Sequence, residues 1–139
     1  MSIVHGLLPG AQVLDLCAGS GALGIEALSR GAEHATFVES SERVIRTLRQ
    51  NIETLGARDR CTILRTDALR FIDGVDGRQF DVAFADPPYA TEVASELATR
   101  WLAMPFAATL GVEHSSRVAM PEGGDTRRYG DTAITFYRA

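Results

Sequence analysis

Short apolar runs alternate along the chain with segments in which apolar residues recur every three or four positions. A short continuous apolar run is typical of a strand buried on both faces of a sheet, and the longer spacing is typical of a helix covering it. Strands are predicted over residues 12–17, 35–38, 61–65 and 81–85 and within 107–113, and helices over 21–30, from Ser40 or Ser41 to Gly56, 68–72 and 92–102. This alternation predicts an α/β fold with a doubly wound, mostly parallel sheet.

The last part of the chain departs from this alternation. Residues 127–137 contain two strand-like stretches joined at Gly130-Asp131, a dipeptide suited to a tight turn. We therefore expect a terminal hairpin, which adds an antiparallel element to the parallel sheet.

Composition places the chain among ordinary globular proteins. Its 139 residues are 45% hydrophobic and 23% charged, which fits one domain over residues 1–139. Cys17 and Cys61 each lie in a predicted strand, so we expect buried thiols in a reducing compartment. We predict neither export nor membrane insertion, and a cytoplasmic location, because no apolar run is long enough to span a bilayer.

The net charge of −4 argues against broad, nonspecific binding to nucleic acid, which normally needs a basic surface. A local basic patch remains compatible with it. Arg117, Arg127 and Arg128 are candidate phosphate contacts, although their being solvated loop arginines is the simpler and favoured interpretation.

A G-x-G-x-x-G pattern, Gly19, Gly21 and Gly24, lies between the first predicted strand and helix. Alone, it fits a dinucleotide site or merely a tight turn that needs glycine. Asp15, near the end of the first strand, would repel a pyrophosphate bound at the following helix, which argues against a dinucleotide.

Acidic residues stand at or near the ends of four predicted strands: Asp15, Glu39, Asp67 and Asp86. Ligands of open α/β sheets bind at this carboxyl edge. An acidic site suits S-adenosylmethionine, which carries a sulfonium, an ammonium, ribose hydroxyls and an adenine amine. Glu39 would accept from the ribose hydroxyls, Asp67 from the adenine amine, and Asp15 would order the amino-acid end. As alternatives, the only role of Asp67 is to cap the next helix, and Glu39 is only a solvated residue at the end of its strand.

The motifs "LDLCAGSGALGIEALSRGA", "FADPPY", "VEHSSR" and "YGDTAITFYR" together resemble the bacterial 16S rRNA guanine(966)-N2-methyltransferase family of class I S-adenosylmethionine-dependent methyltransferases. The resemblance implies a Rossmann-like sheet of seven strands ending in the antiparallel hairpin. It also implies cofactor contacts from the strand ends and the glycine turn, namely Asp15, Cys17, Ala18, Gly19, Ser20, Gly21, Glu39, Ser40, Asp67, Ala68 and Asp86.

The resemblance also implies that Asp86-Pro87-Pro88-Tyr89 is the catalytic loop. The Asp86 carboxylate and the Pro87 carbonyl can each accept an N–H of the target amine, which directs the nitrogen lone pair at the methyl group. The fixed φ angles of Pro87 and Pro88 hold this loop in place, and neither proline adds an N–H. Tyr89 can stack on an extruded base. Neither a metal nor a histidine base is expected.

The leading interpretation is a methyltransferase for guanine N2 in 16S ribosomal RNA, with that RNA or the 30S subunit as partner and the protein as a monomer or weak homo-oligomer. One alternative is a methyltransferase for amino groups of DNA or another nucleobase. Family members carry a basic N-terminal segment that helps to bind RNA, and residues 1–11 show no match to it. A second alternative is therefore a cofactor-binding remnant without independent activity.

Overall fold

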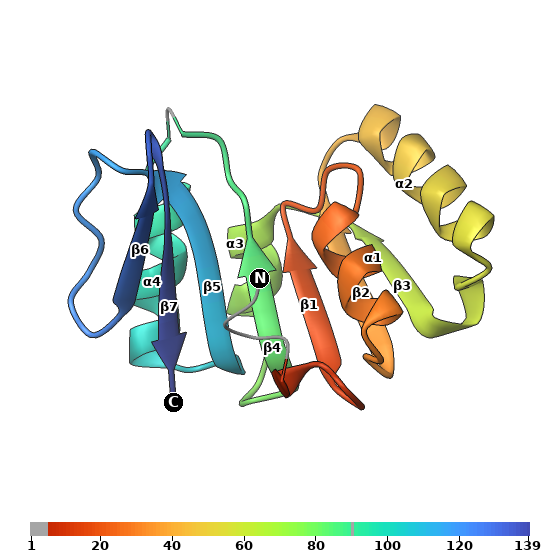
Figure 1. The fold of residues 1–139 in the computed structure, drawn as a ribbon, viewed down its shortest axis with the longest axis horizontal. Helices are drawn as coiled ribbons and strands as arrows, with labels where there is room; N and C mark the ends of the chain where they lie inside the picture. The colour runs from red at the N-terminus through yellow and green to blue at the C-terminus, as the bar shows by residue number, and fades with distance from the viewer. Residues whose placement is uncertain (1–5, 90) are drawn as a thin grey trace.

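The computed structural model describes residues 6–89 and 91–139. Ala90 and residues 1–5 lie outside the described residues. Residues 1–5 belong to the expected domain and to the stretch that was compared with the family's N-terminal segment. The elements are arranged around one sheet (Figure 1). Its strands are β1 (Gln12–Leu16), β2 (His34–Glu39), β3 (Cys61–Arg65), β4 (Phe80–Ala85), β5 (Ala107–Ser115), β6 (Asp125–Tyr129) and β7 (Thr132–Arg138). The helices are α1 (Ala22–Ser29), α2 (Glu42–Leu55), α3 (Ala68–Asp73) and α4 (Val93–Ala103), with a 3-10 helix η2 (Arg58–Arg60).

The seven strands lie in the order β3-β2-β1-β4-β5-β7-β6. Neighbours among the first five pair in parallel, whereas β7 pairs antiparallel with both β5 and β6. The predicted fold class is therefore confirmed, with the C-terminal hairpin turning at Gly130-Asp131 as the sequence indicates.

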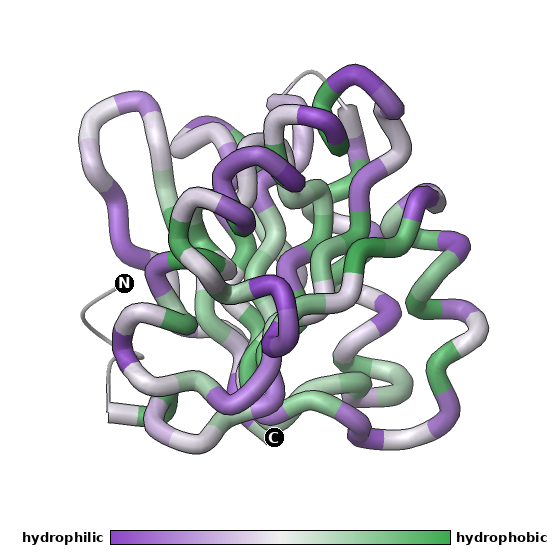
Figure 2. Tube along the Cα trace, turned by 90° about the vertical axis from the view of Figure 1, so that its right-hand side faces the viewer, coloured by the Kyte–Doolittle hydropathy of each residue, from purple (hydrophilic) through white to green (hydrophobic). Residues whose placement is uncertain are grey.

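Helices cover both faces of the sheet (Figure 1). On one face, Leu28 of α1 and Leu48 of α2 pack with Val13 and Phe37 of the strands. The other face packs against α3 and α4, and its core includes Leu14, next to Val13 in sequence, because successive strand residues point to opposite faces. Figure 2 shows the apolar segments gathered in the interior of the molecule. Over the described residues, no helix has the length and apolarity needed to cross a membrane.

Helix α2 shows how local sequence defines an element's ends. Ser41 is its N-cap, and the Ser41 hydroxyl accepts a hydrogen bond from Val44 N at 3.3 Å. Gly56 follows the last turn with φ of 72°, in the left-handed region that glycine adopts without strain. Of the two serines predicted as caps, Ser41 is therefore the one that acts as the cap.

Some predicted boundaries are wrong by a residue or two. Strand β1 ends at Leu16 rather than at Cys17, because Cys17 has φ of 56° and turns the chain out of the sheet. Cys17 and Cys61 are half-buried rather than buried. Gly21 is the N-cap of α1, and Glu92 the N-cap of α4, rather than the first helical residues.

Trp101 connects α4 with the antiparallel part of the sheet. Its side chain is 3% exposed, and its indole N–H donates to the carbonyl of Ala107 at 2.8 Å. Its ring lies 5.8 Å from the ring of Tyr137, which is fully buried in β7. One side chain thus joins a helix to two strands.

We expect Trp101→Phe to lower the free energy of unfolding by about 1–3 kcal/mol, because the buried carbonyl of Ala107 loses its indole donor. Urea denaturation measures this change. Leu102→Ala, on the exposed side of the same helix turn, serves as the control and should change stability by less than about 1 kcal/mol. An equal effect of the two substitutions would contradict the assigned role of Trp101.

Candidate functional site at the carboxyl edge of the sheet

A cavity of about 690 Å³ opens at the carboxyl ends of the parallel strands. Its walls come from the ends of β1, β2, β3, β4 and β5 and the loops that follow them. The lining residues are Cys17, Gly19, Val38, Glu39, Ser40, Thr66, Asp67, Ala68, Asp86, Pro87, Pro88, Tyr89, Thr91, Val93 and Glu113. The volume suits a ligand the size of a nucleoside derivative.

The glycine turn lines this cavity at Gly19, and its other two glycines lie where α1 packs against the sheet and α2. Gly21 has φ of 84°, and a Cβ there would lie 2.2 Å from the Leu48 side chain. A Cβ on Gly24 would lie 2.3 Å from the Phe37 ring. Both positions therefore require glycine, so that α1 can pack closely on β2 and α2.

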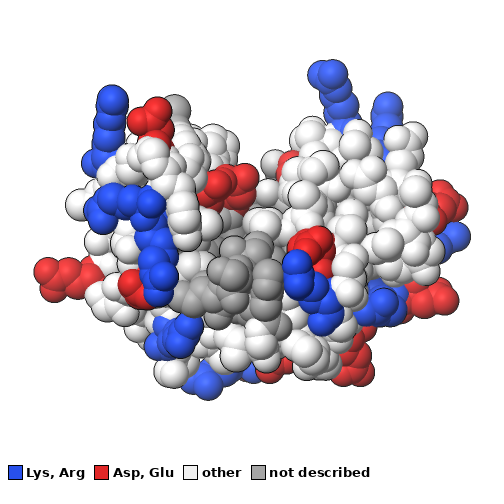
Figure 3. All heavy atoms as spheres, viewed as in Figure 1, with Lys and Arg blue, Asp and Glu red and all other residues white. Residues whose placement is uncertain are grey.

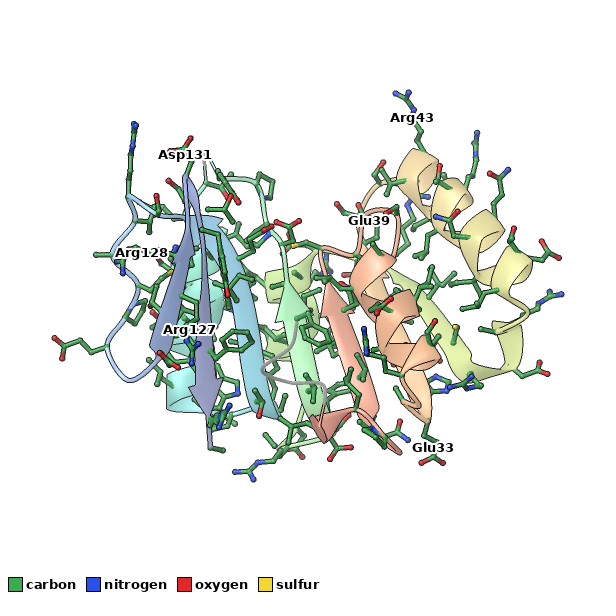
Figure 4. All side chains as sticks on the ribbon, viewed as in Figure 1. Glu33, Glu39, Arg43, Arg127, Arg128 and Asp131 are labelled. Carbon is green, nitrogen blue, oxygen red and sulfur yellow. The ribbon has the colours of Figure 1, made fainter. Side chains whose placement is uncertain are left out.

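Glu39 is fixed by the backbone on two sides. One carboxylate oxygen accepts from Gly19 N at 3.0 Å, and the other accepts from Ser41 N at 2.9 Å. Figure 4 shows Glu39 at the end of β2, beside the loop that leads to α1. Since each carboxylate oxygen has two lone pairs, Glu39 can still accept hydrogen bonds from a ligand.

Asp15 lies beneath the cavity and not in its wall. It is 1% exposed, and its Oδ2 accepts from Gly24 N at 3.0 Å. Burial raises the pKa of Asp15 from its ordinary value of 3.8 to about 8; the Gly24 hydrogen bond lowers it, and the charges of Asp86 and Glu39 raise it further. The structure thus ties Asp15 to the first turn of α1.

The sequence left open whether Asp67 caps a helix or faces the candidate ligand site, and in the structure it does both. It is the N-cap of α3, with its Oδ2 accepting from Arg70 N at 3.1 Å, and it also lines the cavity. The cap occupies one lone pair, so the carboxylate keeps acceptor capacity toward the cavity.

The Asp86 to Tyr89 loop leaves β4 at the far wall of the cavity. Asp86 is exposed, Pro87 is buried, and the Pro88 carbonyl accepts from the Thr91 hydroxyl at 2.8 Å. The Tyr89 side chain is 44% exposed, and its hydroxyl lies 2.9 Å from the Thr132 hydroxyl at the start of β7. The second half of the loop is therefore held by two hydrogen bonds, and all four of its residues line the cavity.

Glu113 is an acidic wall residue that the sequence interpretation missed. It lies inside β5, and the register of β4 and β5 pairs Ala85 with Val112, so the next residues, Asp86 and Glu113, come side by side. Its pKa is raised to about 7, first by a hydrogen bond with Asp86, then by burial and by the Asp86 charge. The quoted motif "VEHSSR" contains this residue and was the signal that could have identified it.

The described wall thus carries four acidic residues and no basic one: Glu39, Asp67, Asp86 and Glu113. Cys17 also faces the cavity, and burial, followed by the neighbouring acids, raises the pKa of its thiol to about 12. The thiol is therefore protonated at neutral pH and is not a nucleophile. Among the predicted contacts, Ala18, Ser20 and Gly21 shape the turn without lining the cavity, whereas the unpredicted wall residues are Val38, Thr66, Thr91, Val93 and Glu113.

The family model described as "Conserved hypothetical protein 95" matches residues 1–138. The chain belongs to this family. It is 37% identical to YlbH of Bacillus subtilis, in an alignment that covers 93% of this chain and 76% of that protein. It is 30% identical to ribosomal RNA small subunit methyltransferase D of Haemophilus influenzae, over 92% of this chain and 70% of the relative.

Solved structures agree with this membership. A conserved hypothetical protein of Streptococcus pyogenes superposes with a TM-score of 0.84 at 33% identity, covering 99% of this chain and 92% of that one. A hypothetical protein of Thermus thermophilus gives 0.82 at 30% identity, over 93% of this chain and 75% of that one. The family resemblance indicated by the sequence motifs is confirmed.

Asp15 should make stability fall as pH rises. A carboxyl with an ordinary pKa of 3.8 and a folded pKa of about 8 stays protonated in the native protein while the unfolded chain has already lost the proton. Its contribution to stability is thus complete below about pH 4 and declines up to about pH 8, by at most about 1.4 kcal/mol per pH unit. We expect Asp15→Asn to remove this decline, since the amide oxygen can still accept from Gly24 N.

Urea unfolding of both proteins between pH 5 and pH 8, without ligand, measures the difference. Asp76→Asn, at an exposed loop acid, is the matched control and should follow the wild-type curve. Parallel curves for wild type and Asp15→Asn would show that Asp15 is ionised in the folded protein.

Proposed function

We propose that this chain is an S-adenosylmethionine-dependent methyltransferase acting on an exocyclic amine of a nucleobase, with guanine N2 of 16S ribosomal RNA as the target. The observation that carries the proposal is the cavity shared by the Asp86 to Tyr89 loop, Glu39 and Asp67. Family membership supports it, since relatives in Haemophilus influenzae and Escherichia coli bear the name ribosomal RNA small subunit methyltransferase D.

The residues of the cavity fit this cofactor. An acidic wall favours a ligand that carries a sulfonium and an ammonium group and disfavours a pyrophosphate. Glu39 would accept from the ribose hydroxyls and Asp67 from the adenine amine, while the turn at Gly19 allows close approach of the backbone. The bound cofactor would supply an electrophilic methyl group. Asp15 would act indirectly, by holding the start of α1 in place.

The loop after β4 would orient the target amine. An amine attached to a purine ring is a weak nucleophile because its lone pair is delocalised into the ring. The Asp86 carboxylate and the Pro87 carbonyl would each accept one N–H, which leaves the lone pair free to point at the methyl group. Tyr89, held by its hydroxyl at Thr132, would offer a stacking face to an extruded base.

Arginines on the two sides of the sheet would contact the phosphates of the RNA. Figure 3 shows arginine side chains projecting at both upper corners of the molecule. Figure 4 places Arg43 at the first turn of α2 and Arg127 and Arg128 on β6, at opposite sides of the sheet. Arg43, Arg127 and Arg128 are all exposed, and Arg127 also pairs with Asp125 at 3.2 Å. The backbone of the RNA would then cross between the two sides.

The deciding experiment incubates the protein with labelled S-adenosylmethionine and, separately, unmethylated small ribosomal subunits, naked small-subunit RNA and duplex DNA. Label in guanosine N2 of the subunits or the RNA supports the proposal. Label in DNA alone would show a DNA methyltransferase. Calorimetric binding of the cofactor without label in any substrate would show a cofactor-binding protein without independent activity.

We expect Asp86→Ala to lower methyl transfer by about 100-fold or more, because the amine loses its main orienting acceptor. Cofactor affinity, measured by calorimetry, should stay within a few fold of the wild-type value, since Glu39 and Asp67 remain. Asp76→Ala, at an exposed loop position, is the control and should transfer normally. An equal loss of affinity and transfer in Asp86→Ala would refute the role assigned to Asp86.

A further inference from the structure

Asp86, directly after β4, and Glu113, inside the adjacent parallel strand β5, form a pair of carboxyl groups. Phe84 pairs with Gly111 and Ala85 with Val112, so Asp86 and Glu113 continue the same register. Adjacent strands lie about 4.8 Å apart, which puts the two side chains within reach of one planar ligand. Both residues line the large cavity.

The same two residues also line a second, smaller cavity of about 230 Å³ on the α1 face of the sheet. The rest of its wall is largely apolar, with Leu23 of α1, Phe84 of β4 and Ile134 and Phe136 of β7. These apolar side chains offer Glu113 no hydrogen-bond partner. Its hydrogen bonds are therefore made with Asp86 or toward the large cavity.

The surroundings of Glu113 determine its protonation. The elements packed against it on the α1 face contribute Leu23, Phe84, Ile134 and Phe136, which carry no charge. His114, next in sequence, points to the other face, where its ring nitrogens lie 2.7 Å from the Thr135 hydroxyl and 2.9 Å from the Ser115 carbonyl. The ionisable groups on the cavity side and beneath it are Asp86, Tyr89, Cys17, Glu39, Asp67 and Asp15. Among them Asp86 has the largest effect: its hydrogen bond with Glu113, followed by burial and the Asp86 charge, raises the pKa of Glu113 to about 7.

Nucleobases differ in whether the ring nitrogen beside the exocyclic amine donates or accepts a hydrogen bond. Guanine has the N2 amine next to the ring N1–H, so two donors lie on one edge. Adenine, cytosine and 2-aminopurine have an amine next to a ring nitrogen that only accepts. An ionised carboxylate accepts hydrogen bonds and donates none, whereas a protonated carboxyl can donate one.

We propose that Glu113 determines base specificity: its ionised carboxylate accepts the N1–H of guanine while Asp86 accepts an N–H of the N2 amine. This inference rests on the proposed function and adds to it the group that selects guanine. A base with a ring acceptor at this position would face the lone pairs of Glu113 and be rejected. Protonation of Glu113 reverses the preference, because the carboxyl can then turn its proton from Asp86 to a ring acceptor of the bound base.

The test uses the full chain and small-subunit RNA. The guanosine that the wild-type protein labels is mapped first, and the RNA is then ligated with 2-aminopurine at that single position. 2-Aminopurine keeps the amine at C2 but replaces the N1–H with an acceptor. We expect kcat/KM for guanine to rise with pH through about 7, and kcat/KM for 2-aminopurine to fall over the same range. At pH 8 guanine should be preferred by about 100-fold or more.

The variant Glu113→Gln supplies a second test, because the glutamine amide can present either an oxygen or an N–H to the base. We expect this variant to prefer guanine by about tenfold or less and to lose the opposed pH trends. Glu122→Gln, at an exposed glutamate, is the matched control and should keep the wild-type preference and pH profile. The wild-type pH profiles test the inference even if Glu113→Gln folds poorly.

The outcomes separate the inference from the function on which it rests. If no guanosine is labelled by the wild-type protein, the proposed function fails and the inference falls with it. If guanosine is labelled but 2-aminopurine is methylated equally well, or with the same pH trend, the function stands and the specificity role of Glu113 is refuted. Unchanged discrimination in Glu113→Gln refutes it as well.

Discussion

The register between neighbouring parallel strands, that is, which residue lies beside which, determines how far each side chain lies from the carboxyl edge of the sheet. Asp15 of β1 pairs with Phe37 on one side and Phe84 on the other, and Phe84 pairs with Gly111. Two positions further along, the next row of side chains comprises Glu39 of β2, Glu113 of β5 and Asp86 directly after β4. The lower row packs under α1, and the upper row lines the cavity. A shift of one strand by a single residue would move its acid to the other face.

The difference between these two rows explains why acids so close together behave differently. Asp15 lies in the lower row between two phenylalanines, where α1 covers it and Gly24 N is the donor that satisfies its Oδ2. Because Gly24 lacks a Cβ, the helix can approach closely enough for this hydrogen bond to form. The buried carboxyl and the glycine turn therefore depend on each other. The acids of the upper row face the cavity, where they can meet a ligand.

Much of the fold follows from local patterns in the chain. Apolar runs, glycine stops and cap residues such as Ser41 predicted the elements to within a residue or two, and with them the strand ends that carry Glu39, Asp67 and Asp86. Lateral register is not encoded in any local pattern, so the burial of Asp15 could not be predicted. Glu113 was missed for a related reason: it closes the stretch 107–113 in which the fifth strand was predicted, but its position beside Asp86 depends on how β4 pairs with β5.

The row of carboxylates also bears on how an acidic protein could act on RNA. Phosphates would be repelled by the cavity wall that suits a cationic cofactor, so the nucleic acid backbone would have to stay outside it, and exposed arginines such as Arg43 and Arg128 lie on the two sides of the sheet (Figure 4). A neutral base carries N–H donors and no charge, and it can approach the same carboxylates favourably. In the proposed reaction, one row of acids would therefore attract the cofactor, exclude the backbone and admit only a base turned out of its stack.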